Sequence, residues 1–282
     1  MTPTNPTPVR CHQFVGAAAA VAVAAGLAAA PPAAASGTTE IEVDVQPITL
    51  TGTLRDFRES HPDMQNPNKS FGVKTGLVRD VLDADGKPWL NPSSNPARGM
   101  ITGEESFNQW FRDVPGVNVA VAHAIELEEH PDKPGVFYFA REKQQSGDAK
   151  YFFPMDGQGF NDLQTTGVGT HNYYFTYELK TEFTYDDPQQ RDHDLTFAFV
   201  GDDDVWVYIN GKLAVDLGGV HGQAGGSVNL DEEAQRLGLE PGGEYELVLF
   251  FAERHVTQSN FRIETTLTLQ EVAPTTISPL YD

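Results

Sequence analysis

Three consecutive aspartates, Asp202, Asp203 and Asp204, form the most distinctive chemical feature of the sequence. They come directly before a short apolar run, residues 205–209, which is typical of a buried strand. Adjacent carboxylates repel one another unless a cation or backbone N–H groups neutralise them. Calcium binds carboxylate, amide and carbonyl oxygens alike. We therefore favour a calcium site here over the alternative of a solvated acidic turn.

A second polar segment could complete this site. Residues 251–261 form a loop between two apolar runs and carry Glu253, His255, Gln258 and Asn260. Loops at one end of a β-sandwich cluster, so this loop could meet the three aspartates. A hairpin loop held by its own hydrogen bonds explains the same spacing equally well.

Other candidate residues have a structural alternative. His221 lies in a glycine-rich loop, residues 218–226, and a lone histidine in such a loop is more often hydrogen-bonded within the protein. Trp206 and Tyr208 alternate with apolar neighbours, so one set of side chains faces the core and the other faces a second layer or a ligand. Core packing is the commoner role for both rings.

No recognisable catalytic motif is present. The sequence lacks a phosphate-binding GxxxxGK[ST] loop, a GxSxG nucleophile motif and an HExxH zinc motif. Paired acids for glycoside hydrolysis are possible among 40 Asp and Glu residues, but no pair has a distinguishing environment. We expect a non-catalytic protein, with a glycan-active enzyme as a third and weaker alternative.

Strands must position these residues, because apolar residues alternate with polar ones along most of the chain. The alternating or apolar runs are residues 48–54, 119–127, 171–185, 195–200, 205–209, 245–252 and 261–269. Asn210-Gly211 between two such runs predicts a tight hairpin. The pattern predicts an all-β, antiparallel, jelly-roll-like sandwich with long loops.

Helix signals are few. Thr102 and Glu105 have the spacing of a capping box, which predicts a short helix that ends near Phe111. Asp231 is placed to cap a second short helix that ends near Leu237.

Composition narrows the partners. The 282 residues carry 19 Lys and Arg against 40 Asp and Glu, a formal net charge of −21. Such a charge disfavours nucleic acids and anionic membrane surfaces and suits hard cations. A single cysteine excludes a disulfide framework.

The two ends of the chain differ from its middle. An apolar run, residues 14–30, followed by Ala33-Ala34-Ala35 is typical of a secretory signal peptide, so we expect residues 1–35 to be cleaved. Residues 36–272 read as a single domain, and residues 273–282 as a Pro/Thr/Ser-rich tail. We expect secretion, with no membrane insertion after cleavage.

Several long segments resemble the fibro-slime domain family. They are GDDDVWVYINGK at 201–212, VDLGGVHG at 215–222, ESFNQWFRDVPGVN at 105–118, HNYYFTYEL at 171–179, FAERHVTQSNFRIET at 251–265, RDF at 55–57 and HPD at 61–63. The resemblance covers residues 49–269. It implies a secreted or cell-surface protein related to the anthrax-protective-antigen-like β-sandwich of fungal flocculins and adhesins.

In those lectins an Asp-Asp pair joined by a cis peptide holds a calcium ion that also binds sugar hydroxyls. The resemblance implies that Asp202 and Asp203, or Asp203 and Asp204, form this pair, with Asn260 or its rival Gln258 completing the shell. Loops around His221 and 253–258 would set specificity for an extracellular glycan or matrix polysaccharide. The alternative is a matrix module that calcium stabilises without any sugar ligand.

Overall fold

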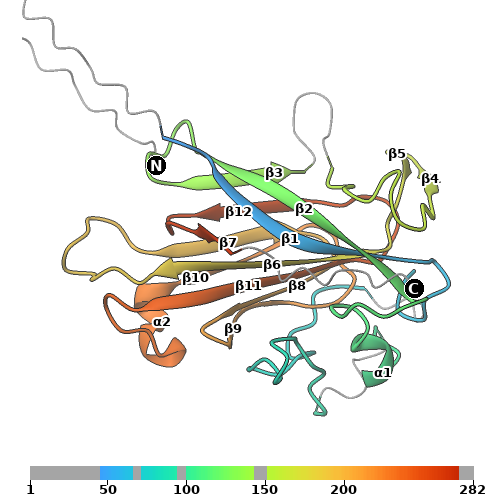
Figure 1. Cartoon of the computed structure of the whole chain (residues 1–282), viewed down its shortest axis with the longest axis horizontal. Coiled ribbons are helices and arrows are strands. Elements are labelled where there is room, and N and C mark those ends of the chain that lie inside the picture. The colour runs from blue at the N-terminus through green and yellow to red at the C-terminus, as the bar shows by residue number, and fades with distance from the viewer. Residues whose placement is uncertain (1–44, 66–70, 94–99, 143–150, 273–282) are drawn as a thin grey trace, which may run out of the picture. The chain divides into compact units, whose positions relative to one another are not determined.

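Antiparallel strands dominate the computed structural model, as the alternating pattern predicts (Figure 1). The strands are β1 (Ile48–Phe57), β2 (Asn118–Glu129), β3 (Phe137–Arg141), β4 (Gln164–Thr166), β5 (Gly169–His171), β6 (Phe175–Thr184), β7 (Thr196–Gly201), β8 (Asp204–Ile209), β9 (Lys212–Leu217), β10 (Ala224–Asn229), β11 (Glu244–Glu253), β12 (Phe261–Thr265) and β13 (Gln270–Glu271). The main sheet has the order β10-β7-β12-β3-β2-β1-β6-β11-β8-β9, with β13 paired to β6. The predicted all-β fold class is confirmed.

The structure describes residues 45–65, 71–93, 100–142 and 151–272. These residues belong to one compact unit. The predicted signal peptide, residues 1–35, and the predicted tail, residues 273–282, lie outside the described residues, as does the beginning of the predicted domain. In the described part of the chain, no helix has the length and apolar character needed to cross a membrane.

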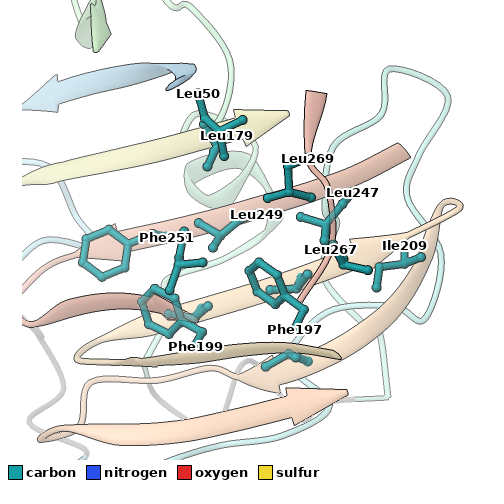
Figure 2. Close-up of a cluster of buried hydrophobic side chains, with 14 of the residues drawn as sticks. Leu50, Leu179, Phe197, Phe199, Ile209, Leu247, Leu249, Phe251, Leu267 and Leu269 are labelled. Atoms are coloured by element: carbon teal, nitrogen blue, oxygen red, sulfur yellow. The ribbon is translucent and has the colours of Figure 1, made fainter. Parts of the chain in front are cut away.

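The main core lies where the long sheet packs one half of itself against the other. Phe199 of β7 and Phe261 of β12 meet Phe251 of β11, with ring centroids 6.1 Å and 5.2 Å from the Phe251 ring. Figure 2 shows this meeting of layers, with Phe197 and Phe199 directed toward Leu249 and Phe251. Burial of these side chains removes a large apolar area from water, which is the main force that holds the two layers together.

A second core covers the opposite face of β8 and β11. Trp206 and Tyr208 of β8 pack there against Phe107 and Trp110, while the intervening Val207 faces the main core. The alternation along β8 therefore separates two apolar layers. Trp206 is 0% exposed, so its ring has the core-packing role that the sequence predicts as the commoner one. Its indole Nε1 donates to Asp216 at 3.1 Å.

The tight turn between β8 and β9 has the predicted hairpin conformation. Asn210 and Gly211 have φ of 50° and 71°, both in the left-handed region. Asparagine and glycine tolerate this region, and two such residues in succession match the twist of an antiparallel pair. The Asn-Gly signal is confirmed.

Both short helices exist, but neither predicted cap is the observed one. Helix α1 (Glu104–Phe107) begins after Gly103 without a side-chain cap, and Thr102 donates its hydroxyl to the carbonyl of Pro62. Helix α2 (Leu230–Leu237) is capped by Asn229, whose side chain accepts from the N–H groups of Asp231 and Glu232. Thr102 and Asp231 instead contact distant segments of the chain, and Asp231 forms an ion pair with Arg191.

Candidate functional site

Two connections cross between the layers at the same end of the sandwich. Residues 202–203 join β7 to β8, and residues 254–260 join β11 to β12. Pairing brings their ends together, because Gly201 lies opposite Phe261 and Asp204 lies opposite Ala252. The predicted proximity of the aspartates and the later loop is therefore confirmed.

Asp202 holds the end of the later loop. Its Oδ1 accepts the backbone N–H of Asn260 at 2.5 Å, and its Oδ2 accepts the side-chain amide at 2.9 Å. The backbone N–H of Asp202 in turn donates to the Asn260 carbonyl at 3.3 Å. Both residues are buried, so these contacts fix the two crossing segments against each other.

Arg254 connects the other two aspartates. Its Nε donates to Oδ2 of Asp204 at 2.7 Å, and its backbone N–H donates to Oδ2 of Asp203 at 3.0 Å. The remaining oxygens accept backbone N–H groups of the glycine-rich loop, Asp204 from Gly219 at 2.5 Å and Asp203 from His221 at 3.2 Å. Each aspartate thus has its own donors.

Glu253 is the exception in this cluster. Its side chain is completely buried, and only Oε1 has a partner, the backbone N–H of His255 at 3.2 Å. Oε2 has no hydrogen-bond partner at normal distance among the described residues, although the side chain of the buried Ser259, whose Oγ is likewise unpartnered, lowers the pKa of Glu253. A buried, unpaired carboxylate oxygen is costly, so it marks a position where a proton or a cation belongs.

Burial opposes ionisation of the cluster. Desolvation raises the pKa of Asp203 to about 8. The charge of Arg254 lowers this pKa, whereas the charges of Asp204 and Asp202 raise it further. Desolvation and the charges of Asp203 and Asp202 raise the pKa of Glu253 well above its usual value. Burial also raises the pKa of Asp202, against the lowering effect of its hydrogen bonds with Asn260.

The excess of carboxylates favours a metal ion in the cluster, whereas the placement of the described side chains does not form a ready metal site. We define the acid cluster as Asp202, Asp203, Asp204 and Glu253; against its four carboxylates, Arg254 supplies one buried guanidinium. Within the described ranges, no three acidic or imidazole side chains are arranged as a metal-binding group. The oxygen chemistry and the unpaired Glu253 Oε2 fit a hard cation, while the aspartates as placed hold hydrogen-bond donors.

The remaining predicted ligand-binding residues lie around this cluster. His221 is only 6% exposed, and its ring nitrogens contact the carbonyls of Gly222 and Leu217. His255 is half-buried, and its ring meets the edge of the exposed Phe71 ring at 5.2 Å. Gln258 is also half-buried, on the loop between β11 and β12.

The peptide bonds within the described residues are all trans, including those that join the three aspartates. The cis peptide that the resemblance implies for the Asp-Asp pair is therefore not observed. Asp204 also differs from the other two aspartates, because an ion pair with Arg254 already neutralises it.

Sequence reasoning missed the organising role of Arg254. Besides Asp204, its Nη1 donates to the carbonyls of Asp63 and Met100, each at 2.9 Å, and its guanidinium lies 4.6 Å from the centre of the Trp110 ring. One side chain thus ties loops more than a hundred residues apart to the cluster. Its place between Glu253 and His255 in a family-like segment was the only signal in the sequence.

The sequence of this chain is similar to those of known proteins. The family model described as PA14 domain matches residues 132–280. Two Dictyostelium discoideum proteins are similar over most of the chain: protein psiR is 36% identical over 78% of it, and protein psiQ is 38% identical over 79%. Each alignment spans 21% of the relative, so the chain corresponds to about a fifth of those proteins.

Among solved structures, a PA14 sugar-binding domain from an RTX adhesin aligns over 78% of this chain and 96% of that one. The identity is 9% and the TM-score 0.29. The narrower fibro-slime resemblance stays a prediction.

Proposed function

Because this chain belongs to the PA14 domain family, we propose that it is a secreted, non-catalytic, calcium-dependent module for carbohydrate binding or adhesion. PA14 domains are a carbohydrate-binding and adhesion type of module. The partner would be an extracellular glycan or a matrix polysaccharide.

The unpaired Glu253 Oε2 carries the calcium proposal. It lies beside the charges of Asp203 and Asp202. Burial opposes the ionisation of all three of these carboxyl groups, and the Arg254 side chain forms an ion pair with none of them. A divalent cation would supply the missing positive charge. Asp202, Asp203, Glu253 and the side-chain oxygen of Asn260 would hold it, and calcium accepts such a set. We leave Asp204 out, because its carboxylate already forms an ion pair with the Arg254 guanidinium.

When bound, calcium would supply a positive centre that can attract hydroxyl groups. The protein's own part is to hold the two crossing segments rigidly around that centre, through the paired contacts between Asp202 and Asn260. The half-buried His255 and Gln258 border the site and would contact a glycan before the buried acids do.

One observation favours a second candidate, a matrix module that calcium stabilises without a sugar ligand. Asp202 is 6% exposed, Asp203 3% and Glu253 0%, so an ion there would have little open coordination space. Both candidates predict that chelation lowers the melting temperature. Only the first predicts that a sugar protects the fold, by ~2.7 kcal/mol at 100 times its dissociation constant.

The deciding experiment combines calcium calorimetry with a glycan array, run in calcium and in chelator. We expect the double variant Asp202→Asn/Asp203→Asn to lose calcium uptake. The matched control Asp132→Asn/Asp192→Asn, which removes two exposed acids, should keep it. Unchanged uptake in the first variant would contradict the site. Calcium uptake with a blank array, from folded protein, would favour the matrix module.

A further inference from the structure

The main sheet is open between β2 and β3. On its other side β2 pairs with β1 without interruption, from Leu127 opposite Ile48 to Asn118 opposite Phe57. Toward β3 it forms only two pairs, at Glu128 and Glu129. The two strands therefore share one sheet at the hairpin end and separate beyond it.

A cavity of about 570 Å³ occupies this opening. Residues 123–126 and Glu128 form one wall, residues 138–141 form the other, and residues 151–154 close one side. We call it the β2–β3 groove. Its volume is within the range of ~300–1,000 Å³ that is usual for small-ligand sites.

Aromatic side chains separate the groove from the main core. Phe152 and Phe139, which line it, are buried, and the Phe152 ring stacks on Phe261 at 4.5 Å. Tyr138 and Tyr151 are half-buried at its walls. The groove is therefore lined by two buried rings and two partly accessible tyrosines.

Several polar side chains along the groove make only ring contacts within the described part of the chain: His123 with Phe152, Tyr138 with His130 and Tyr151 with Phe153. The side chains of His123, Glu126, Glu128, Tyr138 and Tyr151 form no hydrogen bond or ion pair with any described residue. Burial lowers the pKa of His123, so its ring is a neutral donor and acceptor at neutral pH. Carboxylates, phenols and a neutral imidazole above aromatic rings match the hydroxyl and C–H faces of a sugar.

We propose that the β2–β3 groove is a second glycan-binding site, which takes a segment of a polysaccharide without acidic groups and needs no calcium. The lining of the groove contains two carboxylates, Glu126 and Glu128, and one guanidinium, Arg141. Its net charge is therefore negative and repels acidic sugars. The inference rests on the proposed function for the class of ligand. An added polypeptide strand would bind mainly through the backbone edge of β2, whereas the carboxylates, phenols and rings of the groove suit a glycan, which is why we favour a glycan.

The groove also adjoins the acid cluster. The backbone N–H of Phe152 donates to the Ser259 carbonyl at 2.8 Å, next to Asn260. Burial is the main cause that raises the pKa of Tyr151, and the charge of Asp202 is the second. One long polysaccharide, or two chains, could therefore engage both sites, and linked sites strengthen attachment by raising the effective concentration.

The test measures binding to soluble neutral glucan, galactan and mannan, to chitosan oligosaccharides and to alginate, each in calcium and in chelator. We expect binding to at least one non-acidic polymer to persist in chelator. Tyr138→Leu should weaken that binding about tenfold, whereas Tyr138→Phe keeps the ring and should keep most of the affinity. Glu126→Gln/Glu128→Gln should weaken it too, and Asp132→Asn, outside the groove, should not.

The outcomes separate this proposal from the calcium proposal. Absence of chelator-resistant binding would overturn the groove, and so would chelator-resistant binding that neither Tyr138→Leu nor Glu126→Gln/Glu128→Gln changes. Absence of calcium uptake would overturn the acid cluster alone. Reduced, unfolded ribonuclease A serves as a polypeptide probe: if it binds in place of every glycan and the groove variants release it, the site is one for strand addition.

Discussion

At the scale of single residues, the acid cluster is an arrangement of buried charges with too few counter-charges. The ion pair between Arg254 and Asp204 balances one carboxylate, with 0% of either side chain exposed. Removing one partner of a buried ion pair typically lowers the free energy of unfolding by ~3–5 kcal/mol, so we expect the fold to depend on this pair. Burial raises the pKa of Asp203 and of Glu253, which favours a proton or a bound cation at these two acids.

Replacing Glu253 by glutamine separates these two states. The amide removes a charge that burial disfavours, so in chelator we expect Glu253→Gln to unfold at the same or a higher urea concentration than the wild type. In calcium we expect the order to reverse, because the variant lacks a ligand and gains less from the ion. Urea titrations with and without calcium measure both effects.

Asp132→Asn is the control for that comparison, because it removes one exposed carboxylate. It should leave both midpoints close to those of the wild type. A Glu253→Gln protein that calcium stabilises as much as the wild type would contradict the role of Glu253 as a ligand.

At the scale of elements, the site exists because two crossing connections meet at one end of the sandwich. The end of β7 and the start of β12 approach closely at Gly201. A side chain at Gly201 would collide with the Asn260 carbonyl and with the Phe199 ring. The absence of a Cβ there permits the contact between Asp202 and Asn260.

We therefore expect Gly201→Ala to displace the segment around Asn260. The protein should lose calcium uptake in calorimetry and should be destabilised by ~1–3 kcal/mol, the usual cost of overpacking. Gly222→Ala is the matched control, since a Cβ at Gly222 meets no atom within 4 Å. Calcium uptake by Gly201→Ala equal to that of the control would show that this close approach does not position the site.

At the scale of the whole molecule, the raised pKa values couple stability to pH. The pKa of Asp203 is raised to about 8, and that of an aspartate in an unfolded chain is about 3.9. Between these values the folded protein holds a proton that the unfolded chain has released, so its stability falls as pH rises. Glu253 acts in the same direction.

Without calcium, the melting temperature should therefore decrease between about pH 4 and pH 8 because of these groups. Calcium competes with the protons, so its stabilising effect should grow over the same interval. Asp203→Asn should flatten the decrease, whereas Asp192→Asn, a change at an exposed acid, should not. Thermal unfolding at several pH values, in calcium and in chelator, measures this. A calcium effect that is independent of pH would contradict the coupling.

The sequence alone determined the features that depend on local patterns. Period-two alternation identified most of the long strands and the all-β fold class, because a pleated strand turns successive side chains to opposite faces, but it missed β3 and β10. Asn210-Gly211 identified its hairpin, because few other residues accept two consecutive positive φ values. The run of three aspartates marked one half of the candidate site, because no other segment of the sequence has three consecutive aspartates.

Only the tertiary structure decided what those residues do. It buried Trp206 between two layers, separated Asp204 from its neighbours through Arg254, and left Glu253 Oε2 without a partner. It also opened the sheet between β2 and β3, where both strands have an ordinary alternating pattern. These outcomes depend on pairing and packing between distant segments, which local sequence cannot specify because each contact needs a partner placed by the rest of the fold.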